Sequence, residues 1–328
     1  MPKKFLIIQT AFLGDVVLAT PLIEKLRLAF PDASIDFLVR KGNESLLRGH
    51  PFLRQVLVFD KKQKVNSMRA LIGQMRQERY DLVVNAHRFA SSGVMAVLSG
   101  ARAVHGFSKN PLSWAYTRRF PHVIGQSHEV DRNLSLLKGW TDTGFTPPRL
   151  YPPPAAFDSI PEGDYVCMAP TSVWFTKQWP AEKWIALIDR IPSQVKVILL
   201  GGPADKEACE RIREAVRHPD TLNMAGNLSL LESAAWMQRA RMNYVNDSAP
   251  IHLASAMDAP VTAIFCSTVP AFGFTPLSPG ARVVETEENL PCRPCGLHGY
   301  KACPKGHFRC SEIDISRLEP EGVGAKTG

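Results

Sequence analysis

Short apolar runs alternate along the chain with longer segments whose apolar residues recur every three to four positions. Phe5 to Ile8 is the first apolar run, and Val16 to Leu28 is the first helical segment. Runs of this length predict buried strands, and the three-to-four spacing predicts amphipathic helices. In the first half we also predict strands at Ser34 to Val39, Gln55 to Phe59 and Asp81 to Asn85, and a helix at Asn66 to Arg79.

Five prolines between Pro147 and Pro154 interrupt this alternation. Proline continues neither a helix nor a central strand, so the segment predicts a linker between two domains, residues 1–150 and 151–328. Strands alternating with helices predict a parallel, doubly wound α/β sheet in each domain. Beyond the linker we predict strands at 165–169, 195–200, 242–245 and 261–265, and helices at 181–190, 205–216, 230–239 and 250–257.

The composition is that of a folded, water-soluble enzyme. Of 328 residues, 45% are hydrophobic and 21% are charged, which excludes the low hydrophobicity of disordered chains. The apolar start at Phe5 is interrupted by Gly14 and Asp15, which argues against a signal peptide. No apolar run approaches the ~18 residues of a membrane span. We expect a cytoplasmic protein that touches the inner membrane only peripherally.

The formal net charge of +8 favours an acidic partner. No aromatic RNA-binding motif, recognition-helix pattern or zinc-finger histidine pair is present, so nucleic acid is not the expected ligand. A phosphorylated substrate or an anionic membrane face fits better. Four arginines of the first domain are candidates to face an acidic acceptor: Arg69, Arg76, Arg118 and Arg119.

The first motif, Thr10 to Asp15, follows the first predicted strand and opens the first helix. Gly14 permits a tight turn there. Asp15 has two interpretations: a helix N-cap that accepts hydrogen bonds from free amides, or a carboxylate that acts as a general base. The residues alone do not decide between them.

The second motif begins the second domain with Pro170, Thr171 and Ser172 and continues to Lys177. Hydroxyls and amides in a loop after a strand suit phosphate oxygens, and a lysine adds a point charge. The alternative is a solvated lysine before a packing anchor, Trp179.

The third motif places Gly201 and Gly202 after a predicted strand and Asp205 at the next helix. Two glycines let a ligand approach the backbone closely. Asp205 either caps the helix or holds ribose hydroxyls. The three spaced glycines of a dinucleotide-binding fingerprint are not present.

The fourth motif runs from Asn246 through Asp247, Ser248 and Pro250 to His252. Proline suits a first helical turn, Asp or Ser suits the cap, and the free amides of such a helix start attract anions. His252 falls in that first turn. An ordinary capped helix with a half-buried histidine is the alternative.

Four cysteines gather near the end of the chain at Cys292, Cys295, Cys303 and Cys310. One tight pair followed by two more thiols resembles a zinc site, and metal is likelier than a disulfide in a cytosolic chain. The wider spacing of the second pair leaves a reduced, cysteine-rich closing loop within residues 292–310 as the alternative.

Together these motifs resemble glycosyltransferase family 9, the ADP-heptose:lipopolysaccharide heptosyltransferases. The resemblance rests on AFLGDVVLATPLIEKLR, HEVDRNLSLL, TKQWPAEKW, LLGGPADKE and NDSAPIHLASA, and the cysteine-rich end is similar to the heptosyltransferase II branch. It implies a GT-B fold: two Rossmann-like domains facing a cleft, with the acceptor on the first and the nucleotide sugar on the second.

The resemblance also implies roles for individual residues. Asp15 would be the base of an inverting transfer from ADP-heptose to the inner core or lipid A-type part of lipopolysaccharide, with no cofactor required. Lys177 would bind the donor diphosphate, Asp205 the ribose and Leu228 the base. The remaining expected donor ligands are Thr171, Ser172, Asp247, Ser248, Ala249 (glycine in many members) and His252, and the expected acceptor ligands are Thr10, Gly14, His128 and Arg132.

Other functions make different demands on the residues. A sugar-nucleotide epimerase or NAD-dependent oxidoreductase would need the full glycine fingerprint. A non-catalytic sugar-nucleotide-binding protein on the same fold would not need Asp15. A transferase of another activated sugar and a zinc-dependent nucleic-acid module built on the cysteine-rich end complete the alternatives.

Overall fold

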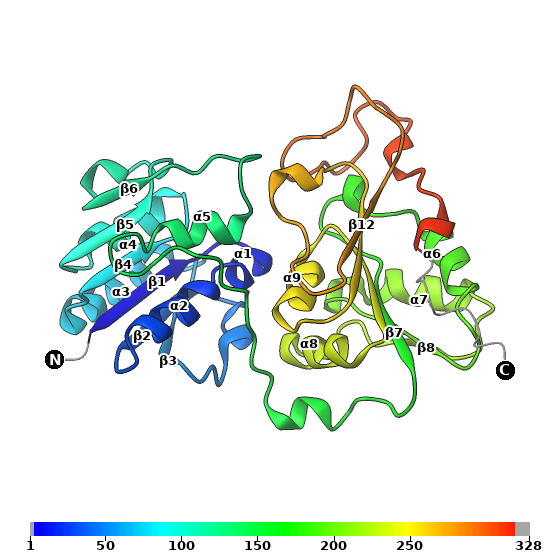
Figure 1. Ribbon diagram of the computed structural model, residues 1–328, viewed down its shortest axis with the longest axis horizontal. Coiled ribbons are helices and arrows are strands. Elements are labelled where there is room, and N and C mark those ends of the chain that lie inside the picture. Colours follow the sequence, from blue (N-terminus) through cyan, green and yellow to red (C-terminus); the bar gives the residue numbers. More distant parts are fainter. Residues whose placement is uncertain (1–2, 319–328) are drawn as a thin grey trace. The chain divides into compact units, whose positions relative to one another are not determined.

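The computed structural model describes residues 3–318. The chain divides between Tyr151 and Pro152 into two compact units (Figure 1). The outer ends of the two predicted domains, residues 1–2 and 319–328, lie outside the described residues. Each unit is built on a six-stranded parallel sheet, which is the α/β architecture expected of a GT-B protein.

The first sheet has the strand order β3-β2-β1-β4-β5-β6. Its order reverses between β1 and β4, and ligands of open α/β sheets bind at the carboxyl side of such a point. The strands are β1 (Lys4–Gln9), β2 (Ser34–Arg40), β3 (Leu53–Phe59), β4 (Leu82–Asn85), β5 (Ala103–Phe107) and β6 (Arg118–Phe120). The helices are α1 (Leu13–Val17), α2 (Pro21–Ala29), α3 (Lys64–Glu78), α4 (Ala90–Leu98) and α5 (Glu129–Ser135).

Both faces of the central strand β1 are buried, which explains its unbroken apolar sequence. Leu6 and Ile8 join the cluster that contains Leu71 and Met75 of α3 and Met95 of α4. Since side chains alternate along a strand, Phe5 points to the opposite face. There its ring packs 5.1 Å from that of Phe30 and 5.6 Å from that of Trp140.

The single helix predicted from Val16 to Leu28 is wrong. α1 ends at Val17, and α2 begins at Pro21. Proline has no N–H to donate to the preceding turn and its ring clashes with that turn, so a helix cannot run through it. Proline is favoured as a first helical residue, where the missing donor has no partner to lose.

The second sheet repeats the same topology, with the order β12-β11-β10-β7-β8-β9. Its order therefore reverses between β7 and β10. The strands are β7 (Tyr165–Ala169), β8 (Lys196–Leu199), β9 (Thr221–Asn223), β10 (Met242–Asn246), β11 (Val261–Phe265) and β12 (Arg282–Glu285). The helices are α6 (Ala181–Ile188), α7 (Lys206–Ala215), α8 (Leu230–Arg239) and α9 (Ala249–Ala256).

The cysteine-rich end packs onto the second domain. Within residues 286–318 the described chain forms turns and two short 3₁₀ helices. Leu290, Cys310 and Ile313 are buried in the same cluster as Trp179. The indole N–H of Trp179 donates to the Ser311 carbonyl at 3.1 Å, so this end is an integral layer of the domain.

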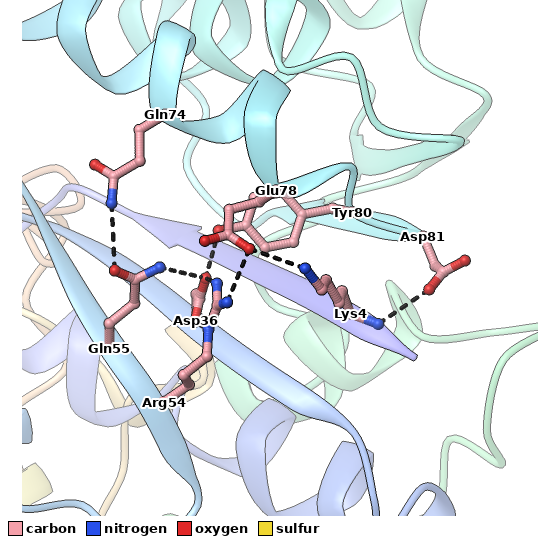
Figure 2. A network of polar contacts seen from close by, with 8 residues as sticks. All are labelled: Lys4, Asp36, Arg54, Gln55, Gln74, Glu78, Tyr80 and Asp81. Atoms are coloured by element: carbon pink, nitrogen blue, oxygen red, sulfur yellow. Dashed lines mark hydrogen bonds and ion pairs between the residues drawn. The ribbon is translucent and has the colours of Figure 1, made fainter. Parts of the chain in front are cut away.

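A charged network closes the edge of the first sheet where its strands begin (Figure 2). The carboxylate of Asp36, fully buried near the start of β2, accepts hydrogen bonds from Arg54, from Gln55 at 2.9 Å and from the Tyr80 hydroxyl. The Arg54 guanidinium also reaches Glu78 at 2.8 Å. Every charge in the network has an opposite partner, as a buried carboxylate requires.

Within residues 3–318, no helix combines the length and the apolar character that a bilayer crossing needs.

Candidate active site

Three predicted motifs follow strands at the reversal points of the two sheets. The Thr10 to Asp15 loop follows β1, and Lys177 lies in the loop after β7. Asp247 to His252 follows β10. These are the positions where open α/β sheets hold ligands.

Asp15 lies in the first turn of α1, and Phe12 occupies the N-cap position. One carboxylate oxygen of Asp15 accepts the N–H of Phe12 at 3.1 Å. Asp15 was considered as the N-cap residue, but it is the third residue of the helix. Its side chain accepts the backbone N–H of the N-cap residue, Phe12. This hydrogen bond closes the first turn of α1 and fixes the position of the Asp15 carboxylate.

The surroundings of Asp15 disfavour its charge. Burial, followed by the negative charge of Glu129, raises the pKa of Asp15 to about 6, although the Phe12 hydrogen bond and the Arg88 charge oppose the increase. A carboxylate with a pKa near neutrality binds a proton far more readily than an exposed one. Perturbed carboxyl groups of this kind concentrate at catalytic positions.

Glu129 is held in place by a buried cluster at the start of α5. Its carboxylate lies 3.0 Å from Nε2 of His122 and accepts Nε of Arg132 at 2.7 Å. Burial alone would raise the pKa of Glu129, but these two partners lower it below the ordinary value. Glu129 consequently remains charged beside Asp15.

Two residues predicted as acceptor ligands, Arg132 and His128, make hydrogen bonds within the first domain. Arg132 is 4% exposed and its guanidinium is taken up by Glu129 and by the carbonyls of Val123 and Ser127. His128 caps α5, since its Nδ1 accepts the Val130 N–H at 3.2 Å. Arg132 supports Glu129 through these contacts inside the domain, and its role as an acceptor ligand stays a prediction.

Thr10 is fully buried and lies beside His87. His87 was not predicted from the sequence as a residue of the site. The Thr10 hydroxyl lies 2.8 Å from His87 Nδ1, and Lys61 donates to the Thr10 carbonyl at 2.9 Å. Burial and the nearby cations lower the pKa of His87 to about 4, so its ring is neutral at physiological pH. Gly14 lies within the first turn of α1.

In the second domain the structure joins two motifs that lie 70 positions apart in the sequence. Nζ of Lys177 lies 2.8 Å from Oδ2 of Asp247, and both side chains are mostly buried. The Thr268 hydroxyl donates to the same oxygen. Thr268, in the loop after β11, carried no recognisable signal in the sequence.

The start of α9 lies directly after Asp247. Ser248 occupies the N-cap position, but its hydroxyl donates to the Asn246 carbonyl at 3.2 Å instead of capping the helix. Ala249 and Pro250 begin the helix, and His252 is 94% buried in its first turn. The positive end of the helix thus lies beside the Lys177–Asp247 pair.

Two further loops of the second domain meet after β8 and β9. The Gly226 N–H donates to the Gly201 carbonyl at 2.9 Å, which brings the loop of Leu228 next to that of Asp205. Asp205 accepts the Gly202 N–H at 2.8 Å, so the Gly-Gly turn is closed by the residue that follows it. Thr171 and Ser172 are both half-buried in the loop after β7.

The predicted zinc ligands lie in the cysteine-rich end of the second domain. Across residues 3–318, no three side chains of His, Cys, Asp and Glu are arranged to hold a metal ion. All seven cysteines are free thiols. Cys292 contacts His307 at 3.8 Å, and Cys310 is buried in the second core. The zinc site and the reduced closing loop both stay predictions.

Comparison with known proteins adds the family. Residues 68–300 match the model of glycosyltransferase family 9 (heptosyltransferase). Lipopolysaccharide heptosyltransferase 3 of Escherichia coli is 29% identical over 78% of this chain and 82% of its own length. Lipopolysaccharide heptosyltransferase 1 of Pseudomonas aeruginosa is 27% identical over 89% and 86%.

The fold has solved counterparts. The structure of the Escherichia coli ADP-heptose lipopolysaccharide heptosyltransferase II superposes with a TM-score of 0.78 at 21% identity, over 96% of both chains. Since the family model covers most of the sequence, the chain belongs to glycosyltransferase family 9 and is a glycosyltransferase.

Proposed function

We propose that this enzyme transfers heptose from ADP-heptose to the core of lipopolysaccharide, with inversion at the anomeric carbon. Curated relatives bear the name lipopolysaccharide heptosyltransferase, and a solved relative is named for ADP-heptose. The first domain would bind the acceptor and the second the nucleotide sugar. The reaction would take place at the cytoplasmic membrane face.

Asp15 is the general base of this proposal. It removes the proton from the acceptor hydroxyl while that oxygen forms a bond to the anomeric carbon. The bond from that carbon to the diphosphate oxygen breaks, and ADP leaves. The observation that carries the assignment is the place of this carboxylate after β1, at the reversal point of the first sheet, where burial also raises its pKa to about 6. Such a group is largely ionised at neutral pH, yet still basic enough to accept a proton.

Lys177 is the cation that stabilises the leaving diphosphate. Its present partner is Asp247, at 2.8 Å. A phosphate oxygen can take over contact with the ammonium group, while Asp247 turns to hydroxyls of the sugar. The amides at the start of α9 add positive potential from the same side. Because these groups are already fixed, they stabilise the developing charge with little reorganisation.

The remaining donor contacts follow the loops. Thr171 and Ser172 hydrogen-bond to the diphosphate, and Ser248, Ala249 and His252 line the same approach. Asp205 and Leu228, whose loops meet, hold the ribose and the adenine. Gly14 and Thr10 shape the turn that presents Asp15 to the acceptor.

We expect the charges of Lys177 and the helix start to suffice without a metal cofactor. Transfer should therefore keep its full rate in excess chelator, measured as release of ADP. A rate that falls with chelator and returns with one divalent ion would contradict a metal-independent mechanism.

The function is tested with purified enzyme and heptose-deficient lipopolysaccharide. ADP-heptose should support ADP release and a mass increase of one heptose on the acceptor, whereas ADP-glucose and UDP-glucose should react poorly. Faster transfer from another activated sugar would redirect the donor assignment. Nucleotide-sugar binding without any turnover would favour a non-catalytic binding protein.

A further inference from the structure

The cysteine-rich end runs directly past the loop that carries Lys177. The N–H of Thr176, the residue before Lys177, donates to the Tyr300 carbonyl at 3.1 Å. In return, the Tyr300 N–H donates to the Thr176 hydroxyl oxygen at 2.8 Å. Two hydrogen bonds thus connect residues that are 124 positions apart.

Gly299 packs against the side chain of Lys177 itself. A methyl group at Gly299 would lie 2.8 Å from the Thr176 hydroxyl and 3.0 Å from Cγ of Lys177. The φ angle of Gly299 is +76°, a conformation that favours glycine. The backbone at Gly299 therefore lies against the aliphatic stem of the lysine, and a larger residue fits there only if the Thr176 hydroxyl and the lysine stem shift.

A second attachment holds the loop that positions Asp247. The Ser267 hydroxyl donates to the Thr176 hydroxyl at 3.0 Å, and the Cys295 N–H donates to the Ser267 carbonyl at 2.8 Å. Arg293 donates to the carbonyls of Cys266 and Thr268, each at 2.7 Å. Thr268 in turn binds Asp247 through its hydroxyl.

We propose that Arg293–Tyr300 is a strap that positions the Lys177–Asp247 pair for the donor diphosphate. The inference rests on the proposed role of Lys177 in binding that diphosphate. Gly299 and Arg293 are positioning residues, because they act through the lysine and through the Thr268 loop. A lysine side chain has large rotamer entropy, and a stem already held in one conformation loses less of it when a phosphate binds.

The chain provides a matched pair of glycines for the test. Gly296 lies in the same strap with a φ angle of +65°, but a methyl group there would meet only the Tyr300 ring, at 3.4 Å from its hydroxyl. Gly299→Ala and Gly296→Ala therefore share the conformational strain of a left-handed backbone. Only Gly299→Ala pushes on Lys177.

We expect Gly299→Ala to raise the Kd for ADP about tenfold more than Gly296→Ala does, measured by calorimetry. Thr176→Val, which removes the hydroxyl that binds Tyr300, should weaken ADP binding too, and Thr176→Ser should restore it. These threonine variants decide the matter if Gly299→Ala does not fold. Equal ADP affinities in both glycine variants, or no rescue by serine, would overturn the strap.

Combining each strap variant with Lys177→Ala separates the strap from the donor site. If the strap acts through Lys177, Gly299→Ala should have little further effect on the ADP Kd in the Lys177→Ala background. A full additional loss in that background would overturn the strap while leaving the donor site intact. A Lys177→Ala variant that binds ADP as tightly as the parent would instead remove the proposed donor site.

Discussion

Two aspartates of the first domain lie at opposite edges of the same sheet and have opposite surroundings. Asp36, where the strands begin, is fully buried and accepts hydrogen bonds from an arginine, a glutamine and a tyrosine (Figure 2). Asp15, after the end of β1, receives a backbone N–H and lies near the negative charge of Glu129.

The difference separates a carboxylate with buried partners from the one that we propose as the base. The carboxylate of Asp36 is matched by hydrogen-bond donors and by the Arg54 guanidinium, which hold it in place inside the sheet. The environment of Asp15 favours its protonated form, which means that the folded state holds the ionised form at a free-energy cost. A carboxylate without a cationic hydrogen-bond partner, at the carboxyl ends of the strands, indicates function more strongly than a fully paired carboxylate where the strands begin.

Among substitutions at these two aspartates, we expect the largest effect on turnover, from replacement of Asp15. Asp15→Asn removes the base but keeps the size and one hydrogen-bonding oxygen, so transfer should fall about 100- to 10,000-fold. The ADP Kd should stay unchanged, because the proposed donor ligands lie in the other domain. Rates of ADP release with saturating donor measure the loss. Turnover near the parental rate would reject Asp15 as the base.

At the opposite edge the expected effect is on stability. Asp36→Ala leaves the Tyr80 hydroxyl and Arg54 without their buried acceptor, and we expect a loss of about 2–4 kcal/mol in the free energy of unfolding. Urea unfolding measures it. Arg102→Ala is the control, because the exposed Arg102–Asp81 pair at 3.2 Å should contribute under about 1 kcal/mol. A large loss of kcat in folded Asp36→Ala protein would break the distinction between the edges.

Sequence patterns predicted most of the fold and the individual site residues, but not their partners. Apolar runs located β1, β2 and β7 within a residue or two. The three-residue strands β6 and β9 are too short to give a pattern. Pro21 sat inside the predicted helix as a visible signal that deserved more weight than the surrounding periodicity.

Partner residues were missed because tertiary packing brings them together. Lys177 and Asp247 were both predicted as donor ligands, yet nothing in either motif showed that they form a direct pair. Glu129 lies inside the motif that suggested His128 and Arg132, but its role depends on α5 packing near Asp15. Asp36 and its partners, which belong to separate segments of the chain, were likewise not predicted.

The raised pKa of Asp15 should make both kcat/KM and stability depend on pH. With a pKa of about 6, a base loses activity as it becomes protonated, so kcat/KM should fall about tenfold per pH unit below that value and level off above it. The sign of the stability effect follows. The folded-state pKa lies above the unfolded one, so the parent loses stability relative to Asp15→Asn as pH rises from about 4 to 6.

The assignment would be supported if the free energy of unfolding of the parent, relative to that of Asp15→Asn, falls over this pH interval and is constant above it. Thermal unfolding in a buffer series measures it, and the expected size is roughly 1–3 kcal/mol. If the parent instead gains stability relative to Asp15→Asn as pH rises through the interval, the folded environment stabilises the charged form of Asp15, and the assignment is wrong.

The smallest effect tests the contribution of Glu129. Glu129→Gln removes the negative charge but keeps an oxygen for Arg132, so Asp15 should become more acidic and the acid limb of kcat/KM should move down by roughly half a pH unit. Asp131→Asn, which neutralises an exposed carboxylate on the same helix, is the control and should leave the limb in place. A uniform loss of rate without movement of the limb would assign Glu129 a packing role only, and the basicity of Asp15 would then come from burial alone.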